Sequence, residues 1–195
     1  MLYSAYELAY AAVAPARIAA GVSAKFWRSP FNPAANTWVA RSAAAALDVF
    51  ENAMRRYPKP DWGLNATTVN GVDVPVTVQE VEHKSFCKLL RFVRDEDALN
   101  KARGAGKADP AVLIVAPLSG HHATLLRGTV EAMLPDHDVY ITDWTDARNV
   151  PISAGRFDLN DYIDYLIDFM RTIGRSNGNM GVHAMAVCQP GPALL

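Results

Sequence analysis

The chain has 195 residues, a formal net charge of −1, and 50% hydrophobic and 20% charged residues. This balance is that of an ordinary globular protein with one sizeable core or two small ones. A near-neutral net charge gives no field that would attract nucleic acid or an anionic membrane surface. The two cysteines, Cys87 and Cys188, form no CxxC pair, so neither a zinc site nor a disulfide framework is indicated and a cytoplasmic location is favoured.

The first sixty residues are expected to be helical. Residues 8–20 are apolar and alanine-rich, but the first ionisable side chain is Glu7, so the basic segment that opens a secretory signal is missing. We interpret this stretch as an amphipathic helix capped by Ser4. A second helix is expected over residues 36–56, and no stretch approaches the length of a membrane span. Residues 1–62 therefore form an N-terminal helical segment.

Residues 63–195 are expected to form an α/β domain that begins with antiparallel strands. Asn70-Gly71 lies between two alternating runs and is the strongest short-range signal for a β-hairpin. The polar, glycine-bearing stretch 100–110 is typical of a surface loop. The continuous apolar run 112–116 is then typical of a strand buried on both faces.

The rest of this domain alternates helices and strands. A helix is expected over residues 125–134 and a strand over 139–142. Asp158 is expected to cap the clearest helix of the chain, which ends near Gly174, and residues 181–187 form the next strand. Antiparallel strands followed by such alternation indicate an α/β sheet with an antiparallel edge, in the element order of an α/β-hydrolase.

Cys188 follows the last of these strands, and Gln189-Pro190-Gly191 turns the chain sharply towards a helix. A nucleophile on a strand-to-helix turn is the nucleophile elbow of α/β-hydrolases. Such an elbow needs a small residue two positions before the nucleophile, which Ala186 supplies. Pro190 replaces the usual glycine two positions after it, and proline is tolerated in the first turn of a helix. The backbone N–H of Gln189 is expected to form one half of an oxyanion hole.

The other half is expected in the loop after the strand that ends near residue 116. This loop contains glycine and two histidines, and the backbone N–H of Gly120 or His121 is the candidate donor. An ordinary strand-to-helix loop with solvent-exposed histidines is the equally weighted alternative. We expect neither a cofactor nor a metal ion at this site.

The remaining ionisable residues give no clear general base. His183 lies five residues before Cys188 on the same strand, hence on the opposite face and about 16 Å away at ~3.3 Å per residue. A core or helix-facing position is expected for His183, and surface positions are expected for His83 and His137.

Three other residues have structural roles in this interpretation. Cys87 is expected to be a small buried hydrophobe. Asp143 and Asp146 follow a strand and could orient a base, but the acid of this fold comes from a strand after the nucleophile. We therefore expect Asp143 to be structural or part of the floor of the site.

Four segments of the chain resemble the intracellular polyhydroxyalkanoate (polyhydroxybutyrate) depolymerases. They are residues 1–3, residues 56–64, residues 116–128 and Val187-Cys188-Gln189-Pro190. The similarity runs along the whole chain but covers only about the first half of such an enzyme. In that family the cysteine of the Val-Cys-Gln-Pro segment is the nucleophile, and the resemblance implies the same role for Cys188.

The implied reaction is hydrolysis of 3-hydroxyalkanoate ester bonds through a thioester on the cysteine. The implied partner is the polyhydroxyalkanoate polymer or its granule surface, with a cytoplasmic, granule-associated location; homo-oligomerisation stays open. The aspartate and histidine of the family lie further along than Leu195. The chain is therefore expected to be a hydrolase fold truncated after the elbow strand, with little or no activity alone.

Two alternatives belong to different functional classes. A polyhydroxyalkanoate synthase-like acyltransferase also uses a cysteine on this fold, but its elbow has the pattern Gly-x-Cys-x-Gly, against which Ala186 and Pro190 argue. The other alternative is a non-catalytic protein that associates with the granule.

Overall fold

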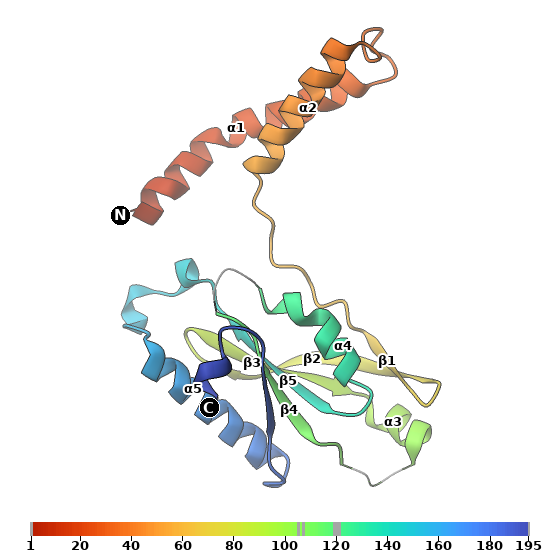
Figure 1. Cartoon of the computed structure of the whole chain (residues 1–195), viewed down its shortest axis with the longest axis vertical. Coiled ribbons are helices and arrows are strands. Elements are labelled where there is room, and N and C mark those ends of the chain that lie inside the picture. Colours follow the sequence, from red (N-terminus) through yellow and green to blue (C-terminus); the bar gives the residue numbers. More distant parts are fainter. Residues whose placement is uncertain (1, 105, 107, 119–121, 195) are drawn as a thin grey trace. The chain divides into compact units, whose positions relative to one another are not determined.

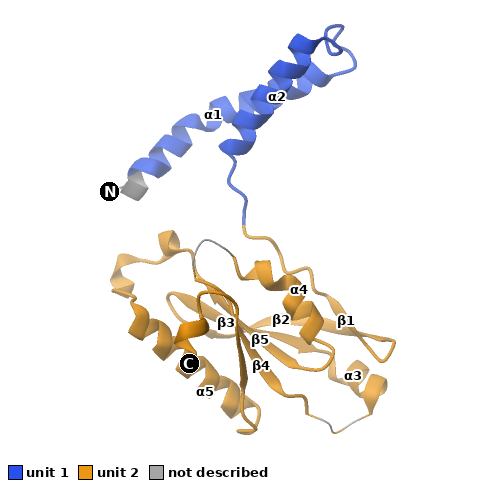
Figure 2. Ribbon diagram, viewed as in Figure 1, with its two compact units in different colours: residues 1–58 blue, residues 59–195 orange. Residues whose placement is uncertain are grey.

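The computed structural model describes residues 2–104, 106, 108–118 and 122–194. The chain divides into two compact units, Met1–Pro58 and Lys59–Leu195 (Figure 2). No helix among the described residues combines the length and the apolar character that a membrane crossing requires.

The first unit is a helical hairpin of α1 (Leu2–Arg28) and α2 (Trp38–Ala53) (Figure 1). The Thr37 hydroxyl caps α2 by accepting a hydrogen bond from the N–H of Ala40 at 3.3 Å. Because α1 already begins at Leu2, Ser4 lies inside the helix, and the expected cap at Ser4 is wrong. The residues buried between the two helices are small: Ala20, Ala24, Ala40 and Ala44.

The second unit opens with the expected β-hairpin of β1 (Ala66–Val69) and β2 (Val72–His83). Asn70 and Gly71 have φ values of 49° and 80°, the two left-handed positions of a tight hairpin turn. Val69 lies opposite Val72, so the turn has two residues and the hairpin prediction is confirmed.

Four further strands complete a mixed sheet: β3 (Cys87–Arg94), β4 (Ala111–Val115), β5 (Asp138–Trp144) and β6 (His183–Ala186). The strand order is β1-β2-β3-β5-β4-β6. Strands β1, β2, β3 and β5 pair antiparallel, whereas β4 pairs parallel with both β5 and β6. The expected α/β sheet with an antiparallel edge is therefore confirmed.

Helices cover both faces of this sheet (Figure 1). The 3₁₀ turn Ala123–Leu126 leads into α4 (Arg127–Met133), which packs on one face, and α5 (Leu159–Ser176) packs on the other. Strand β4 is buried along its whole length, as its continuous apolar sequence predicts. The core is thus two apolar layers, one on each side of β4 and β5.

The ends of two helices differ from the sequence expectation. Helix α3 (Glu96–Arg103) occupies part of the segment expected to be a loop, and the Asp95 side chain caps it by accepting from the N–H of Ala98 at 2.8 Å. The capping of α5 by Asp158 is confirmed. This helix does not end at Gly174 but continues to Ser176, because the sharp turn with positive φ comes later, at Gly178.

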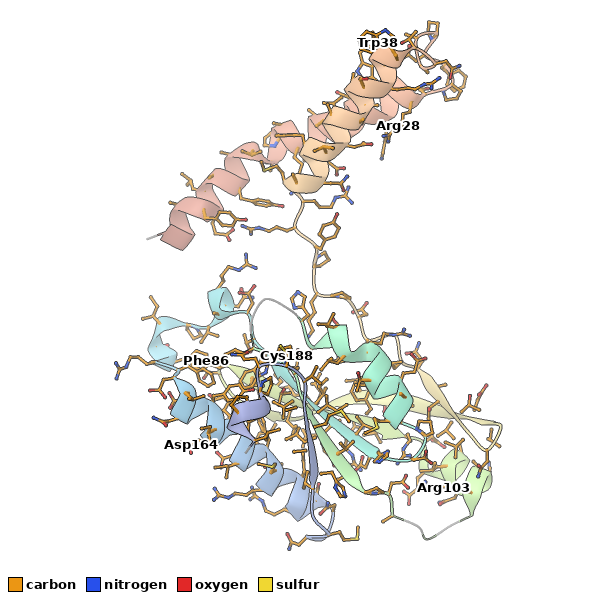
Figure 3. The ribbon with its side chains drawn as sticks, viewed as in Figure 1. Arg28, Trp38, Phe86, Arg103, Asp164 and Cys188 are labelled. Carbon is orange, nitrogen blue, oxygen red and sulfur yellow. The ribbon has the colours of Figure 1, made fainter. Side chains whose placement is uncertain are left out.

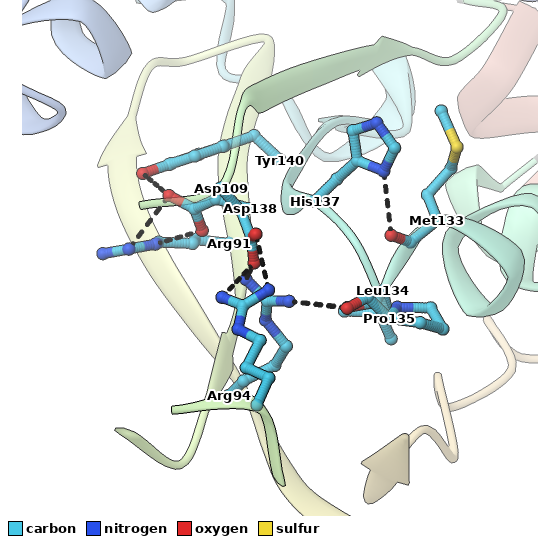
Figure 4. Close-up of polar contacts among 10 residues, drawn as sticks. Arg91, Arg94, Asp109, Met133, Leu134, Pro135, His137, Asp138 and Tyr140 are labelled. Carbon is cyan, nitrogen blue, oxygen red and sulfur yellow. Dashed lines mark hydrogen bonds and ion pairs between the residues drawn. The ribbon is translucent and has the colours of Figure 1, made fainter. Parts of the chain in front are cut away.

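Buried and half-buried ion pairs hold the edge of the sheet where the parallel strands begin. Asp109, just before β4, accepts hydrogen bonds from Arg94 and Arg103, the shortest 2.6 Å from each. Asp138, the first residue of β5, accepts two from Arg91 at 2.9 and 3.0 Å (Figure 4). These pairs join β3, α3 and the starts of β4 and β5 at the edge opposite Cys188.

Candidate functional site

The carboxyl ends of β4, β5 and β6 meet at one edge of the sheet, where ligands commonly bind in α/β proteins. Hydrogen bonds fix the three ends to one another. The N–H of Val187 donates to the carbonyl of Val115 at 3.3 Å, and the Trp144 indole donates to the carbonyl of Ala116 at 2.9 Å. The Thr142 hydroxyl accepts from the N–H of Ala116 at 2.9 Å. This bonding gives the residue after β6 a rigid support.

Cys188 lies at this edge, on the turn that follows β6 (Figure 3). Its φ is +67°, in the left-handed region that costs a residue with a side chain ~1–2 kcal/mol. The N–H of Gly191 donates to the carbonyl of Cys188 at 3.2 Å and closes the turn. Cys188 is exposed, and its thiol forms no hydrogen bond with any described residue. The thiol is thus presented to solvent from a strained backbone.

Gln189 connects this turn to the loop after β4. Its side-chain oxygen accepts a hydrogen bond from the N–H of Leu118 at 3.0 Å. The backbone N–H of Gln189 has no acceptor among the described residues. The other two candidate oxyanion donors, Gly120 and His121, lie outside the described residues.

The described histidines are not arranged as a base for Cys188. His83, His122 and His183 are exposed, and none is hydrogen-bonded to the thiol within the part of the chain that the structure describes. The expected core or helix-facing position of His183 is wrong, because β6 is the outer strand of the sheet. His137 is half-buried rather than on the surface, with Nδ1 3.2 Å from the carbonyl of Met133.

Cys87 is fully buried on the α5 side of the sheet, as expected of a small hydrophobe. Burial, and then the nearby Asp143 carboxylate, raise the pKa of the Cys87 thiol well above its usual value. Asp143 forms an ion pair with Lys59, while its Oδ1 is buried without a partner among the described residues. Asp146 pairs with Arg148, whose hydrogen bonds lower the pKa of that carboxyl group. Both aspartates therefore have local partners.

We expect the two cysteines to differ in reactivity in the native protein. Iodoacetamide is expected to alkylate Cys188 about a hundredfold faster than Cys87, because only the first is exposed and the second can react only after local opening. Peptide mass spectrometry after timed alkylation measures both rates. Urea should equalise them, and Cys188→Ser should remove the fast phase. Equal rates in native buffer would contradict the burial of Cys87.

A cavity of about 460 Å³ opens beside the Cys188 turn, within the usual size range of ligand pockets. Gln189, the residue after the nucleophile candidate, forms part of its wall. The remaining wall is mostly apolar and comes from the loop after β4, the start of α5 and the 3₁₀ turn Gly191–Ala193: Leu118, Phe157, Asp158, Leu159, Tyr162, Ile163, Pro192 and Ala193. Such a cavity suits an apolar acyl group.

Two of the aromatic residues that line this cavity, Phe157 and Tyr162, stack on further aromatic rings. The Trp144 and Tyr162 rings stack with centroids 4.7 Å apart, and the Phe86 and Phe157 rings stack at 4.5 Å. The Tyr162 hydroxyl is buried without a hydrogen-bond partner among the described residues. Burial, followed by the nearby Cys87, raises the pKa of Tyr162 to about 12.

Tyr162→Phe is expected to raise the free energy of unfolding by about 1 kcal/mol, because it removes a buried hydroxyl that lacks a partner. The effect should grow at alkaline pH. Unfolded tyrosine ionises near pH ~10, whereas folded Tyr162 holds its proton to about 12, so the stability of the native protein falls across this interval. Urea unfolding at pH 8 and at pH 11 measures both effects. Tyr165→Phe, at a half-buried tyrosine on the same helix, is the matched control and should change the free energy of unfolding at pH 8 by less than about 0.5 kcal/mol.

Two features of the site were missed at the level of sequence. The hydrogen bond between Gln189 and the loop after β4 joins residues 71 positions apart, so no local pattern predicts it. The stacking of Tyr162 on Trp144 was not predicted, because Tyr162 fits the helical spacing of apolar residues in α5 and was interpreted as a core residue of that helix. The cluster of Phe157, Tyr162 and Tyr165 around the start of one helix was the available signal.

The arrangement combines an exposed thiol, a backbone N–H that has no acceptor within the described part of the chain, and an apolar cavity, which are parts that acyl transfer to a cysteine requires. Among the described residues, no three histidine, cysteine, aspartate or glutamate side chains come together as metal ligands. No protein-family model, curated protein or solved structure matches the chain.

Proposed function

We propose that this chain carries the nucleophile of a cysteine-dependent carboxylic ester hydrolase of the α/β-hydrolase architecture. The observation that carries the proposal is the φ of +67° at exposed Cys188, directly after the outer parallel strand. Strained residues persist only where the surrounding structure holds them, and they concentrate at functional sites. A nucleophile elbow requires this kind of turn, because it lifts the side chain clear of the sheet.

The topology of the sheet supports the same proposal. From β3 the chain passes to β4 and then returns to β5, which pairs between them, antiparallel to β3 and parallel to β4. It then crosses to the elbow strand β6, which lies on the far side of β4. The two crossover helices α4 and α5 lie on opposite faces. This arrangement is compatible with the first strands of an α/β-hydrolase sheet, in which the nucleophile follows the third parallel strand in sequence.

The proposed chemistry uses the three parts of the site. The Cys188 thiolate attacks the ester carbonyl carbon, a C–S bond forms, and the C–O bond to the leaving alcohol breaks as the alcohol takes up a proton. The N–H of Gln189 stabilises the negative charge on the carbonyl oxygen. Water then cleaves the thioester, releasing the acid and restoring the thiol. The substrate that the resemblance implies is a polyhydroxyalkanoate, whose short apolar acyl units suit the cavity beside Gln189.

Acyl trapping tests this proposal. Incubation of the chain with p-nitrophenyl butyrate is expected to add one butyryl group, and peptide mapping should place it as a thioester on Cys188. Treatment with neutral hydroxylamine should remove it, as for other thioesters. Slow turnover is expected, because no described histidine is bonded to the thiol. Acylation at a lysine or serine, with Cys188 unmodified, would disprove the nucleophile assignment.

A further inference from the structure

The α1–α2 hairpin carries its large apolar side chains on the outside. Its buried contacts are made by alanines, whereas Phe31 is 94% and Trp38 78% exposed. A hairpin that is self-sufficient in water has the reverse pattern, with large apolar residues inside. Clusters of exposed apolar side chains commonly mark surfaces that bind something.

Exposed apolar side chains occur along the hairpin, Leu8 and Val49 among them, and the most exposed aromatic ones lie towards its loop end. On α1, Ile18, Val22 and Phe26 are four residues apart and each more than 60% exposed, so they form one stripe along the helix. The stripe leads to the loop that contains Phe31, and Trp38 lies at the loop end of α2 (Figure 3). We call Phe26, Phe31 and Trp38 the aromatic tip.

The hairpin is also basic, although the whole chain has a net charge of −1. Residues 8–47 contain no acidic residue and four basic ones: Arg17, Lys25, Arg28 and Arg41. Arg28 pairs with Asp48, but Lys25 and Arg41 are exposed and have no acidic partner in the described ranges. Basic side chains thus flank the aromatic tip on both helices. The near-neutral net charge conceals this local excess.

We propose that the aromatic tip and the flanking Lys25 and Arg41 form a docking surface for an anionic lipid surface. Aromatic side chains partition into the interface between headgroups and acyl chains, and lysine and arginine contact the anionic headgroups. Each basic residue near such a surface adds to the attraction. An uncharged surface would cover the apolar side chains but would gain nothing from a segment without acidic residues. Charge complementarity therefore favours the anionic surface.

Vesicle co-sedimentation with the full chain tests this inference. Binding to phosphatidylcholine vesicles that contain about 30% phosphatidylglycerol is expected to be at least about tenfold tighter than binding to phosphatidylcholine alone. Raising the salt from ~0.1 M to ~1 M NaCl should remove most of this difference, since the Debye length falls to about 3 Å. Equal binding to the two kinds of vesicle, or none to either, would overturn the proposal.

Two variants separate the apolar and the electrostatic contributions. Phe31→Ser/Trp38→Ser should weaken binding to anionic vesicles about tenfold or more, because it removes the inserted side chains. Lys25→Glu/Arg41→Glu should weaken it at least as much. Lys101→Glu/Arg156→Glu makes the same net charge change at exposed positions of the second unit and should bind like the parent, as should Ile152→Ser at a 98% exposed position.

Two results would count against the docking surface even if vesicles bind. The first is equal weakening by the hairpin charge variant and by its control, which would mean that only net charge matters. The second is a concentration-dependent dimer that Phe31→Ser/Trp38→Ser dissociates while vesicle binding is unaffected, which would make a second copy the occupant. Far-UV circular dichroism confirms that each variant keeps its helices, and the altered side chains are all exposed.

Discussion

Asp109→Ala is expected to lower the free energy of unfolding of the second unit by about 3–5 kcal/mol, the usual effect of removing one partner from a buried ion pair. The side chains of Asp109 and Arg94 are 4% and 7% exposed. Removing the carboxylate would leave the Arg94 and Arg103 guanidinium groups without their shared acceptor. Arg94 would keep only its backbone contacts, of which the shorter is 2.9 Å to the carbonyl of Leu134.

The effect of Asp109 on stability should depend on pH in a defined direction. Burial by itself raises the pKa of Asp109, but hydrogen bonds from Arg103 and Arg94 outweigh it and hold the pKa below its ordinary value. An aspartate with a lowered pKa stabilises the fold above its unfolded pKa of ~3.9 and loses that contribution as the pH falls. The difference between the parent and Asp109→Ala should therefore be full at pH 7 and shrink below about pH 4.

Urea unfolding followed by tryptophan fluorescence measures this difference. Trp27→Phe/Trp38→Phe is the background of choice, because the remaining Trp62 and Trp144 then report the second unit alone. Asp164→Ala, at an exposed position of α5, is the matched control and should change stability by less than about 0.5 kcal/mol. An Asp109→Ala effect as small as that of the control would show that the buried pairs do not hold this edge.

Local sequence patterns predicted which helices and strands the second unit contains more accurately than the residues at which they begin and end. Asn70-Gly71 specified its turn because two successive left-handed residues are favourable there. Asp158 specified the start of α5 through reciprocal hydrogen bonds with residues of the first turn. Gly174 misled because a glycine within a helix and a glycine that ends one have the same sequence signal. Helix α3 was missed because the glycines after it dominated the pattern of its segment.

Long-range features were beyond the reach of such patterns. The crossover that places β4 between β5 and β6 depends on packing of whole layers, not on the sequence of any one strand. The exposure of His183 follows from that order, since it makes β6 the outer strand. For the site, spacing and turn residues were enough to single out Cys188. The cavity and the Gln189 contact required the folded chain, because their residues come from distant segments.

Cys188→Ala is expected to abolish acylation by p-nitrophenyl butyrate. The rate of p-nitrophenol release, after subtraction of spontaneous ester hydrolysis, should fall at least ~10³-fold. Of the two cysteines only Cys188 is exposed, and Gln189, with its backbone N–H, follows it directly in the sequence. Cys87→Ala is the control for loss of a thiol and should acylate like the parent, because Cys87 is buried on the α5 face. Stoichiometric acylation that survives Cys188→Ala would remove the basis of the proposed function.

At position 188, the side chain that the proposed reaction requires is expected to lower the stability of the fold. Cys188→Gly is expected to be about 1 kcal/mol more stable than Cys188→Ala, because glycine adopts a φ of +67° without the clash that a Cβ atom causes. Glycine is usually the less stable of the two residues, so this inversion identifies the strained turn directly. Urea unfolding of the two variants measures the difference. Greater stability of Cys188→Ala would mean that the turn relaxes without its thiol, and the strain would then not be a property of the scaffold. The expected inversion would instead mean that the fold holds a reactive side chain at a position where glycine is more stable. Loss of stability in return for a positioned reactive group is typical of functional sites.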